Sequence, residues 1–82
     1  MDLRISLACK KAINLCNYML HQQNDEYVRN RRLKINSLMT ENKNQESAIV
    51  AKEVSSYIQK HFDNIVGENV ILEIDRLLKE SS

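Results

Sequence analysis

The sequence predicts an all-α protein, folded as a three- to four-helix antiparallel bundle. The chain has no proline and a single glycine, Gly67. Asn-Gly and Asp-Gly pairs, which favour the tight turns of β-hairpins, do not occur in it. Apolar residues instead recur at steps of three and four, the spacing that places them on one side of a helix. For 82 residues with a hydrophobic fraction of 43%, we expect a single globular helical domain.

The first predicted helix spans residues 3–21 and contains both cysteines of the chain. Cys9 and Cys16 are roughly 10 Å apart along the helix axis, at about 1.5 Å per residue. A disulfide needs Cα atoms within about 7 Å, so these two residues cannot pair with each other. We expect two buried thiols in a reducing compartment, with an intermolecular bridge as the alternative. The apolar side of this helix comprises Ile5, Ala8, Cys9, Ala12, Ile13, Cys16, Met19 and Leu20.

A second, weaker helix is predicted over residues 26–39. Asn24 or Asp25 can cap its amino terminus, because their side-chain oxygens accept hydrogen bonds from the first free backbone N–H groups. Thr40 to Ser47 contains no large apolar residue, which indicates a loose polar connector after this helix. Its apolar side comprises Val28, Ile35, Leu38 and Met39.

The third predicted helix, over residues 44–66, has the most regular apolar pattern of the chain. Asn42, followed three residues later by Gln45, has the spacing of a capping box at its amino terminus. Its apolar stripe follows steps of three and four. The stripe comprises Ala51, Val54, Ile58, Phe62 and Ile65.

The fourth predicted helix covers residues 69–80, and its phase decides how it joins the third. If residues 48–80 formed one straight helix, the two apolar stripes would lie about 180° apart. A break at Gly67, a residue suited to the left-handed conformation after a helix end, lets both stripes face one core. Asn69 then caps the fourth helix. The alternative is an unbroken helix with two opposed faces for two partners. The fourth stripe comprises Val70, Ile71, Ile74, Leu77 and Leu78.

Four basic residues lie close together in the second helix, namely Arg29, Arg31, Arg32 and Lys34. With Lys10 and Lys11 they could neutralise the phosphates of DNA or RNA. On a helix, however, Arg29 and Arg32 point one way and the other two point another. The net charge is only +1 and the sequence pI about 7.8, so no broad positive field surrounds the cluster. A helix-turn-helix would also need a tight turn where the polar connector lies. We therefore favour an ordinary solvated helix face and keep nucleic-acid binding as the alternative.

Several residues lie off the apolar stripes and indicate a second contact surface that faces outward. Leu7 and Tyr18 fall on the polar side of the first helix, and Leu33 and Leu72 lie off the stripes of theirs. Arg31 lies on the apolar side of the second helix. Its stem can pack at the edge of the core while its head reaches water, or its planar fork can hold a carboxylate of a partner. These five residues form the predicted protein-interaction site.

Catalytic and metal-binding patterns are not recognisable in the sequence. Ser56 and His61 lie about 140° apart around the third helix, so they cannot form a nucleophile–base pair. His21 lies on a separate segment from His61, with no ligand spacing typical of zinc. Glycine-rich phosphate loops do not occur either. We expect no catalytic residue, no metal and no cofactor.

No segment approaches the roughly 18 apolar residues that cross a bilayer. Lys10 and Lys11 interrupt what would be the apolar core of a signal peptide, so we expect a cytoplasmic protein without membrane contact. The sequence thus predicts a small, non-catalytic regulatory or adaptor protein that binds another protein through helix faces. Because so small a domain has a thin core, we expect a homodimer. The alternative is a nucleic-acid-binding protein that uses the basic cluster.

Overall fold

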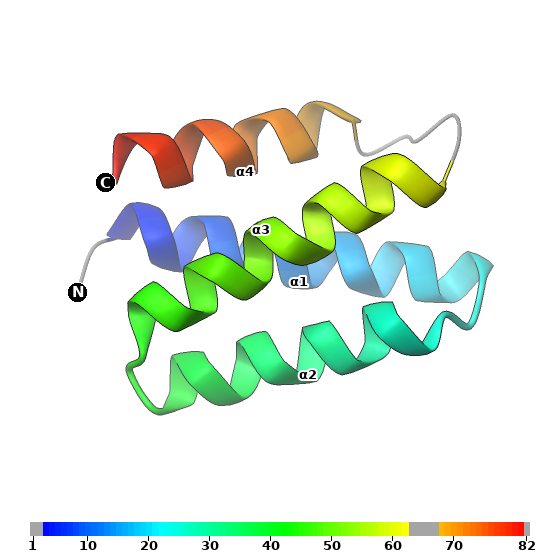
Figure 1. Ribbon diagram of the computed structural model, residues 1–82, viewed down its shortest axis with the longest axis horizontal. Coiled ribbons are helices and arrows are strands. Elements are labelled where there is room, and N and C mark those ends of the chain that lie inside the picture. Colours follow the sequence, from blue (N-terminus) through cyan, green and yellow to red (C-terminus); the bar gives the residue numbers. More distant parts are fainter. Residues whose placement is uncertain (1–2, 63–67, 82) are drawn as a thin grey trace.

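The structure is a computed structural model that describes residues 3–62 and 68–81. Four α-helices make up nearly all of this part, and it contains no strand. They are α1 (Leu3–Gln22), α2 (Glu26–Thr40), α3 (Asn44–His61) and α4 (Glu68–Glu80). Consecutive helices run in opposite directions (Figure 1). The prediction of an all-α antiparallel bundle is confirmed, with four helices.

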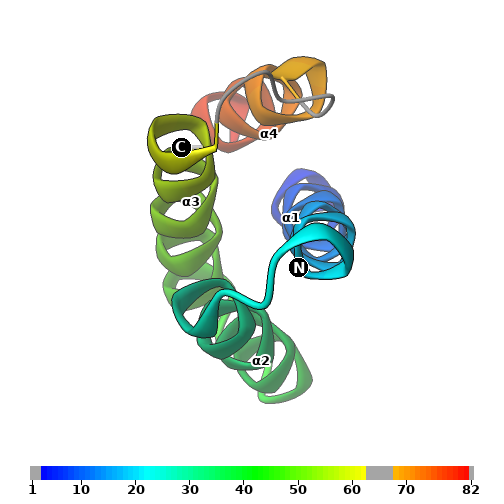
Figure 2. The ribbon, with the colours of Figure 1, turned by 90° about the vertical axis from the view of Figure 1, so that its right-hand side faces the viewer.

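The helices form two inner and two outer elements. α1 and α3 contact each other, and each also contacts both α2 and α4. Within the described ranges, α2 and α4 make no contact with each other. The end view in Figure 2 shows these two helices at opposite ends of the bundle. Each outer helix therefore keeps a broad outward face.

Small residues let α1 lie against three neighbouring helices. Ala8, Cys9, Ala12 and Cys16 are completely buried, and their short side chains allow the neighbouring helices to approach closely. Leu15 is buried as well, whereas Ile13 and Leu20, which were predicted on the apolar side, are only half-buried. The buried side of α1 is thus wider than its sequence pattern indicates. The other core residues are Ile5, Met19, Val28, Ile35, Leu38, Val50, Ala51, Val54, Ile58, Ile71, Ile74 and Leu77.

The connection between α2 and α3 is a tight turn, and this corrects the prediction of a loose connector from Thr40 to Ser47. Asn42 adopts a left-handed conformation with φ of 60°, which asparagine tolerates better than most residues. Its N–H donates to the carbonyl of Met39 at 3.0 Å, and the N–H of Lys43 donates to the carbonyl of Leu38 at 2.9 Å. These two bonds form a Schellman motif that ends α2.

The predicted capping box of Asn42 and Gln45 is therefore wrong. Asn42 ends the preceding helix, and Lys43 occupies the N-cap position of α3 without a side-chain hydrogen bond to the helix. Ser47, assigned to the connector by its polarity, is buried inside α3. Its hydroxyl donates to the carbonyl of Asn44 at 2.8 Å. The cap of α2 is confirmed, because Asp25 accepts a hydrogen bond from the N–H of Val28 at 3.0 Å.

α3 and α4 are separate helices that pack against each other. This confirms that the two helices are separate and contradicts the alternative of one long helix, while the predicted position of the break at Gly67 lies outside the described residues. The predicted end of the third helix at residue 66 is wrong, because α3 ends at His61 and Phe62 is extended. Asn69 is not a cap, since it lies inside α4. Ile65 and Gly67 lie outside the described residues.

Candidate protein-interaction site

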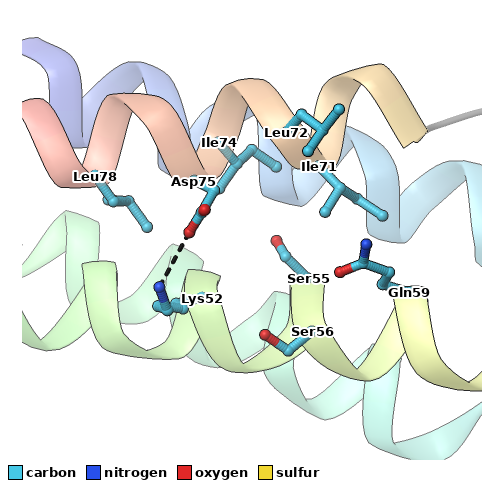
Figure 3. Close-up of a pocket in the computed structure, with 9 residues that line it drawn as sticks. All are labelled: Lys52, Ser55, Ser56, Gln59, Ile71, Leu72, Ile74, Asp75 and Leu78. Carbon is cyan, nitrogen blue, oxygen red and sulfur yellow. Dashed lines mark hydrogen bonds and ion pairs between the residues drawn. The ribbon is translucent and has the colours of Figure 1, made fainter.

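A pocket of about 190 Å³ lies between α3 and α4, the least closely packed of the contacting helix pairs. Its two walls differ in chemistry (Figure 3). α4 supplies mostly apolar side chains, whereas α3 supplies hydroxyl, amide and amino groups. We call this pocket the α3–α4 groove. It is lined by Lys52, Ser55, Ser56, Gln59, Ile71, Leu72, Ile74, Asp75 and Leu78.

Short serine side chains account for the open space on the α3 side. The hydroxyl of Ser55 turns back and donates to the carbonyl of Ala51 at 2.8 Å, so it does not reach across to α4. Ser56, one residue further along α3, is exposed. The α3 wall therefore has two short side chains between the longer Lys52 and Gln59, opposite the apolar side chains of α4 (Figure 3).

An ion pair joins the two walls of the groove. Lys52 Nζ lies 3.0 Å from Asp75 Oδ1, and Lys79 Nζ lies 3.1 Å from Asp75 Oδ2. The hydrogen bond from Lys52, followed by that from Lys79, holds the pKa of Asp75 below its usual value despite some desolvation. A carboxylate engaged by two ammonium groups is a poor general base.

Of the five predicted interaction residues, Leu72 is the one that lines the groove. Its side chain is 58% exposed and lies on the outer edge of the apolar wall (Figure 3). Leu33 is 52% exposed on α2, the helix that does not contact α4 within the described residues. Leu7 and Tyr18 are exposed on α1. The structure thus exposes all four apolar residues of the predicted site but distributes them over three helices.

Sequence reasoning missed three other exposed apolar residues, namely Tyr27, Leu3 and Ile49. Leu3 and Ile49 are more exposed than any residue of the predicted site. Leu3 precedes Leu7 by four residues, so both share one side of α1. Ile49 lies off the apolar stripe of α3. The positions of Leu3 and Ile49, off the apolar stripes of their helices, could have identified them as exposed, as they did Leu7 and Leu33.

Arg31 binds a carboxylate of its own chain. Its Nη1 lies 3.6 Å from Glu53 Oε1 on α3, and its guanidinium lies over the ring of Tyr27 at 5.3 Å from the centroid. The Nε of Arg31 is buried without a hydrogen-bond partner among the described residues. The Tyr27 ring also stacks on Tyr57 of α3, with 4.3 Å between centroids. Arg31 is therefore part of the contact between α2 and α3.

Asp25 links the same two helices through its second oxygen. The hydroxyl of Tyr57 donates to Asp25 Oδ2 at 2.8 Å. Desolvation alone would raise the pKa of Asp25, but the hydrogen bonds from Val28 and Tyr57 outweigh it and leave this pKa below its usual value. The pKa of Tyr57 is raised, first by that hydrogen bond and then by desolvation. The sequence alone could not predict the contact between Asp25 and Tyr57, because the two residues are far apart in the chain.

The four basic residues of α2 do not form one surface. Arg29 donates to the side-chain oxygen of Asn24, and Arg32 Nη1 donates to Asn17 Oδ1 of α1 at 2.9 Å. Arg31 faces α3, and Lys34 is exposed without a polar partner among the described residues. Arg29 and Arg32 are thus directed away from Arg31, as the helical spacing predicts.

The turn between α2 and α3 is tight, so the predicted loose connector no longer argues against a helix-turn-helix. The orientation of the helices still argues against a helix-turn-helix, because α2 and α3 run side by side in opposite directions (Figure 1). A helix-turn-helix instead crosses its two helices at about 90–120°.

Comparison with protein-family models, curated proteins and solved structures finds no match to this chain. No described helix combines the length and the apolar character needed to cross a membrane. The described residues also hold no group of three or more His, Cys, Asp or Glu side chains placed to bind a metal ion.

Proposed function

We propose that this protein is a small, non-catalytic regulatory or adaptor protein that binds other proteins through helix faces and forms a homodimer through the α3–α4 groove. The observation that carries the proposal is the position of Leu72. An exposed apolar side chain lies directly beside a pocket of about 190 Å³ on the same surface. A two-fold dimer requires such a self-complementary patch, since each copy presents the same residues to the other.

In the proposed dimer, Leu72 of each copy enters the groove of the other. There it contacts Ile71 and Leu78, while Ser56 and Gln59 supply hydrogen-bonding groups at the edge. Full burial of a leucine is worth about 1.5–3 kcal/mol, so covering the exposed part of Leu72 contributes roughly 1 kcal/mol per copy. Because the patch is used twice, each favourable contact counts twice.

Dimerisation would also support a small fold. A chain of this length buries a smaller fraction of its surface than larger domains do, so its stability margin is thin. Any partner that binds only the folded chain adds to the apparent stability. We also propose a cytoplasmic location, which the free, buried thiols of Cys9 and Cys16 support.

Sedimentation equilibrium of the wild type and two serine variants tests the proposal. We expect the wild type to dimerise within about 1–100 μM, and Leu72→Ser to raise the dissociation constant at least about tenfold, because two leucine contacts are lost. Leu33→Ser is the matched control, since it removes a similarly exposed leucine from α2. Circular dichroism should show that both variants keep the wild-type helix content.

Two results would contradict the proposal. A wild-type chain that stays monomeric at all concentrations from about 1 to 100 μM would show that the proposed dimer does not form. Equal weakening by Leu72→Ser and Leu33→Ser would place the contact outside the groove, or would show that loss of any surface leucine has the same effect.

A further inference from the structure

The basic side chains of the protein divide into those with and those without a carboxylate partner. Arg4, Lys11 and Arg76 pair with acidic residues of α4, and Lys52 and Lys79 pair with Asp75 of the same helix. Arg31 and Lys43 also have partners. The basic residues without a carboxylate partner among the described residues are Lys10, Arg29, Arg32, Lys34 and Lys60.

Two of these cations are oriented next to each other by neutral amides. Arg29 donates to Asn24, and Arg32 donates to Asn17 at 2.9 Å. An amide oxygen fixes a guanidinium without neutralising its charge, and it leaves other N–H groups of the fork free for an acceptor. α1 contains no acidic residue along its entire length. Within residues 3–62 and 68–81, neither of these two cations pairs with a carboxylate, although Asp25 and Glu26 lie at the start of the same helix, α2.

Arg32 also borders a shallow depression of about 290 Å³ between α1 and α2, which is lined by Asn17, Leu20, His21 and Arg32. Leu33 follows Arg29 by four residues, so the two are neighbours on the surface of α2. We call Asn17, Leu20, His21, Arg29, Arg32 and Leu33 the α1–α2 face. This face combines oriented cations with half-buried and exposed leucines.

We infer that the α1–α2 face binds an acidic amphipathic segment of a partner protein. Carboxylates of the segment accept hydrogen bonds from Arg29 and Arg32, whose planar forks suit carboxylate recognition. Apolar side chains on the same side of the segment contact Leu20 and Leu33. The inference rests on the proposed role in protein binding for the class of partner, but it uses a different surface from the α3–α4 groove and does not require the dimer.

Charge and composition favour a protein segment over a nucleic acid at this face. The net charge of the protein is only +1, and α4 on the opposite flank has four acidic and two basic residues. A long polyanion would also meet the acidic residues of α4, whereas a short acidic segment can contact Arg29 and Arg32 without reaching α4. The apolar residues here are leucines, which fit aliphatic side chains, and His21 supplies the single aromatic ring of the face as defined.

Fluorescence anisotropy with a synthetic probe tests the inference. The probe is a fluorescein-labelled helical peptide of Glu, Leu and Ala, about 18 residues long, with its leucines on one side. We expect binding at about 50 mM salt, and at least about tenfold weaker binding for the double variant Arg29→Gln and Arg32→Gln. Titration should also shift the NMR signals of the Asn17 and Asn24 side-chain amides.

The control is the double variant Lys34→Gln and Lys60→Gln, which loses the same charge from two lysines outside the α1–α2 face that have no carboxylate partner among the described residues. We expect it to change the affinity less than about twofold. Equal weakening by both double variants would show that overall charge governs binding and would overturn the inference. Absence of wild-type binding would overturn it as well.

A DNA duplex of equal charge serves as the competing probe. Tighter binding of this duplex at the α1–α2 face would make the face a nucleic-acid surface and overturn the inference. Leu72→Ser should bind the acidic peptide with wild-type affinity, because that residue lies in the α3–α4 groove. Failure of the dimer proposal and failure of this inference therefore give different results.

Discussion

At the scale of single residues, Asp25 combines two structural roles. One carboxylate oxygen accepts from the N–H of Val28 and caps α2, and the other accepts from the hydroxyl of Tyr57 on α3. Because Tyr57 also stacks on Tyr27, the start of α2 and the end of α3 are joined by both polar and aromatic contacts. Asp25 thus connects local helix capping with tertiary packing.

Asp25 provides a prediction about acid stability. Its pKa is lower in the folded chain than the usual value of 3.8, so the folded state binds protons less readily than the unfolded state. The charged carboxylate therefore stabilises the fold above about pH 3.8, and this contribution is lost as the pH falls through the folded pKa. We expect Asp25→Asn to be less stable than wild type at neutral pH and equally stable in strong acid.

Urea unfolding of the wild type and two variants at neutral and acidic pH provides the measurement. Asn and Asp are similar N-cap residues, so Asp25→Asn removes the charge and one of the two acceptor oxygens but keeps the cap, whereas Asp25→Ala also removes the cap at a cost of about 1 kcal/mol. A stability difference between wild type and Asp25→Asn that stays constant with pH would contradict the assigned pKa direction.

At the scale of secondary-structure elements, the helices could be predicted from sequence better than their ends. The apolar period placed each helix, and Asp25 is the cap of α2 among the two residues, Asn24 and Asp25, that the sequence offers. Asn42 was assigned to the wrong helix, because asparagine suits both an N-cap and the left-handed residue after a helix, and the sequence pattern does not distinguish them. Because Phe62 is apolar and in phase with the third stripe, the sequence pattern continues the helix past His61. The backbone of Phe62 is in fact in the β conformation.

Asn42 provides the prediction at this scale. A left-handed backbone costs roughly 1–2 kcal/mol for a residue with an ordinary Cβ. We expect Asn42→Ala to lower the free energy of unfolding by about 1 kcal/mol, and Asn42→Gly to leave it unchanged or raise it slightly. Thermal unfolding of the three proteins measures this order. If Asn42→Ala proved as stable as Asn42→Gly, the turn would not require a left-handed residue.

In the candidate sites, too, features set within one helix could be predicted from the sequence, whereas features set by the packing of two helices could not. The exposure of Leu72 follows from its phase in one helix, so it could be predicted from the sequence. The α3–α4 groove depends on how closely two helices pack and on where Ser55 directs its hydroxyl, and neither is encoded in the period of one stripe. The internal pairing of Arg31 with Glu53 likewise depends on the position of α3 beside α2.

At the scale of the whole molecule, α1 and α3 form the centre of the bundle. Cys9 and Cys16 on α1 are fully buried, and the hydroxyl of Ser47 on α3 accepts from the thiol of Cys9 at 3.5 Å. Desolvation by burial raises the pKa of Cys16 to about 12, and it also raises that of Cys9 against the opposing effect of Ser47. Both thiols are therefore protonated and inaccessible in the folded chain.

The thiols thus report on opening of the whole bundle. We expect a disulfide reagent at about pH 8 to modify both cysteines at least about 100-fold more slowly in the native protein than in urea, because only opened chains expose a thiolate. Both residues should react at the same rate, since they lie in one core. Rapid modification of either thiol in native protein would contradict this close packing of α1. A parallel reaction of Ser or Ala variants of each cysteine identifies the residue modified.

The central claim concerns the surface through which two copies meet. Isotope-filtered NMR on a mixture of labelled and unlabelled protein measures it directly, because only contacts between copies give a signal. The proposed dimer predicts such contacts from the methyl groups of Leu72 in one copy to Ile71 and Leu78 in the other. A dimer whose intermolecular contacts omit Leu72, or involve Leu33 on α2 instead, would contradict the assignment of the α3–α4 groove.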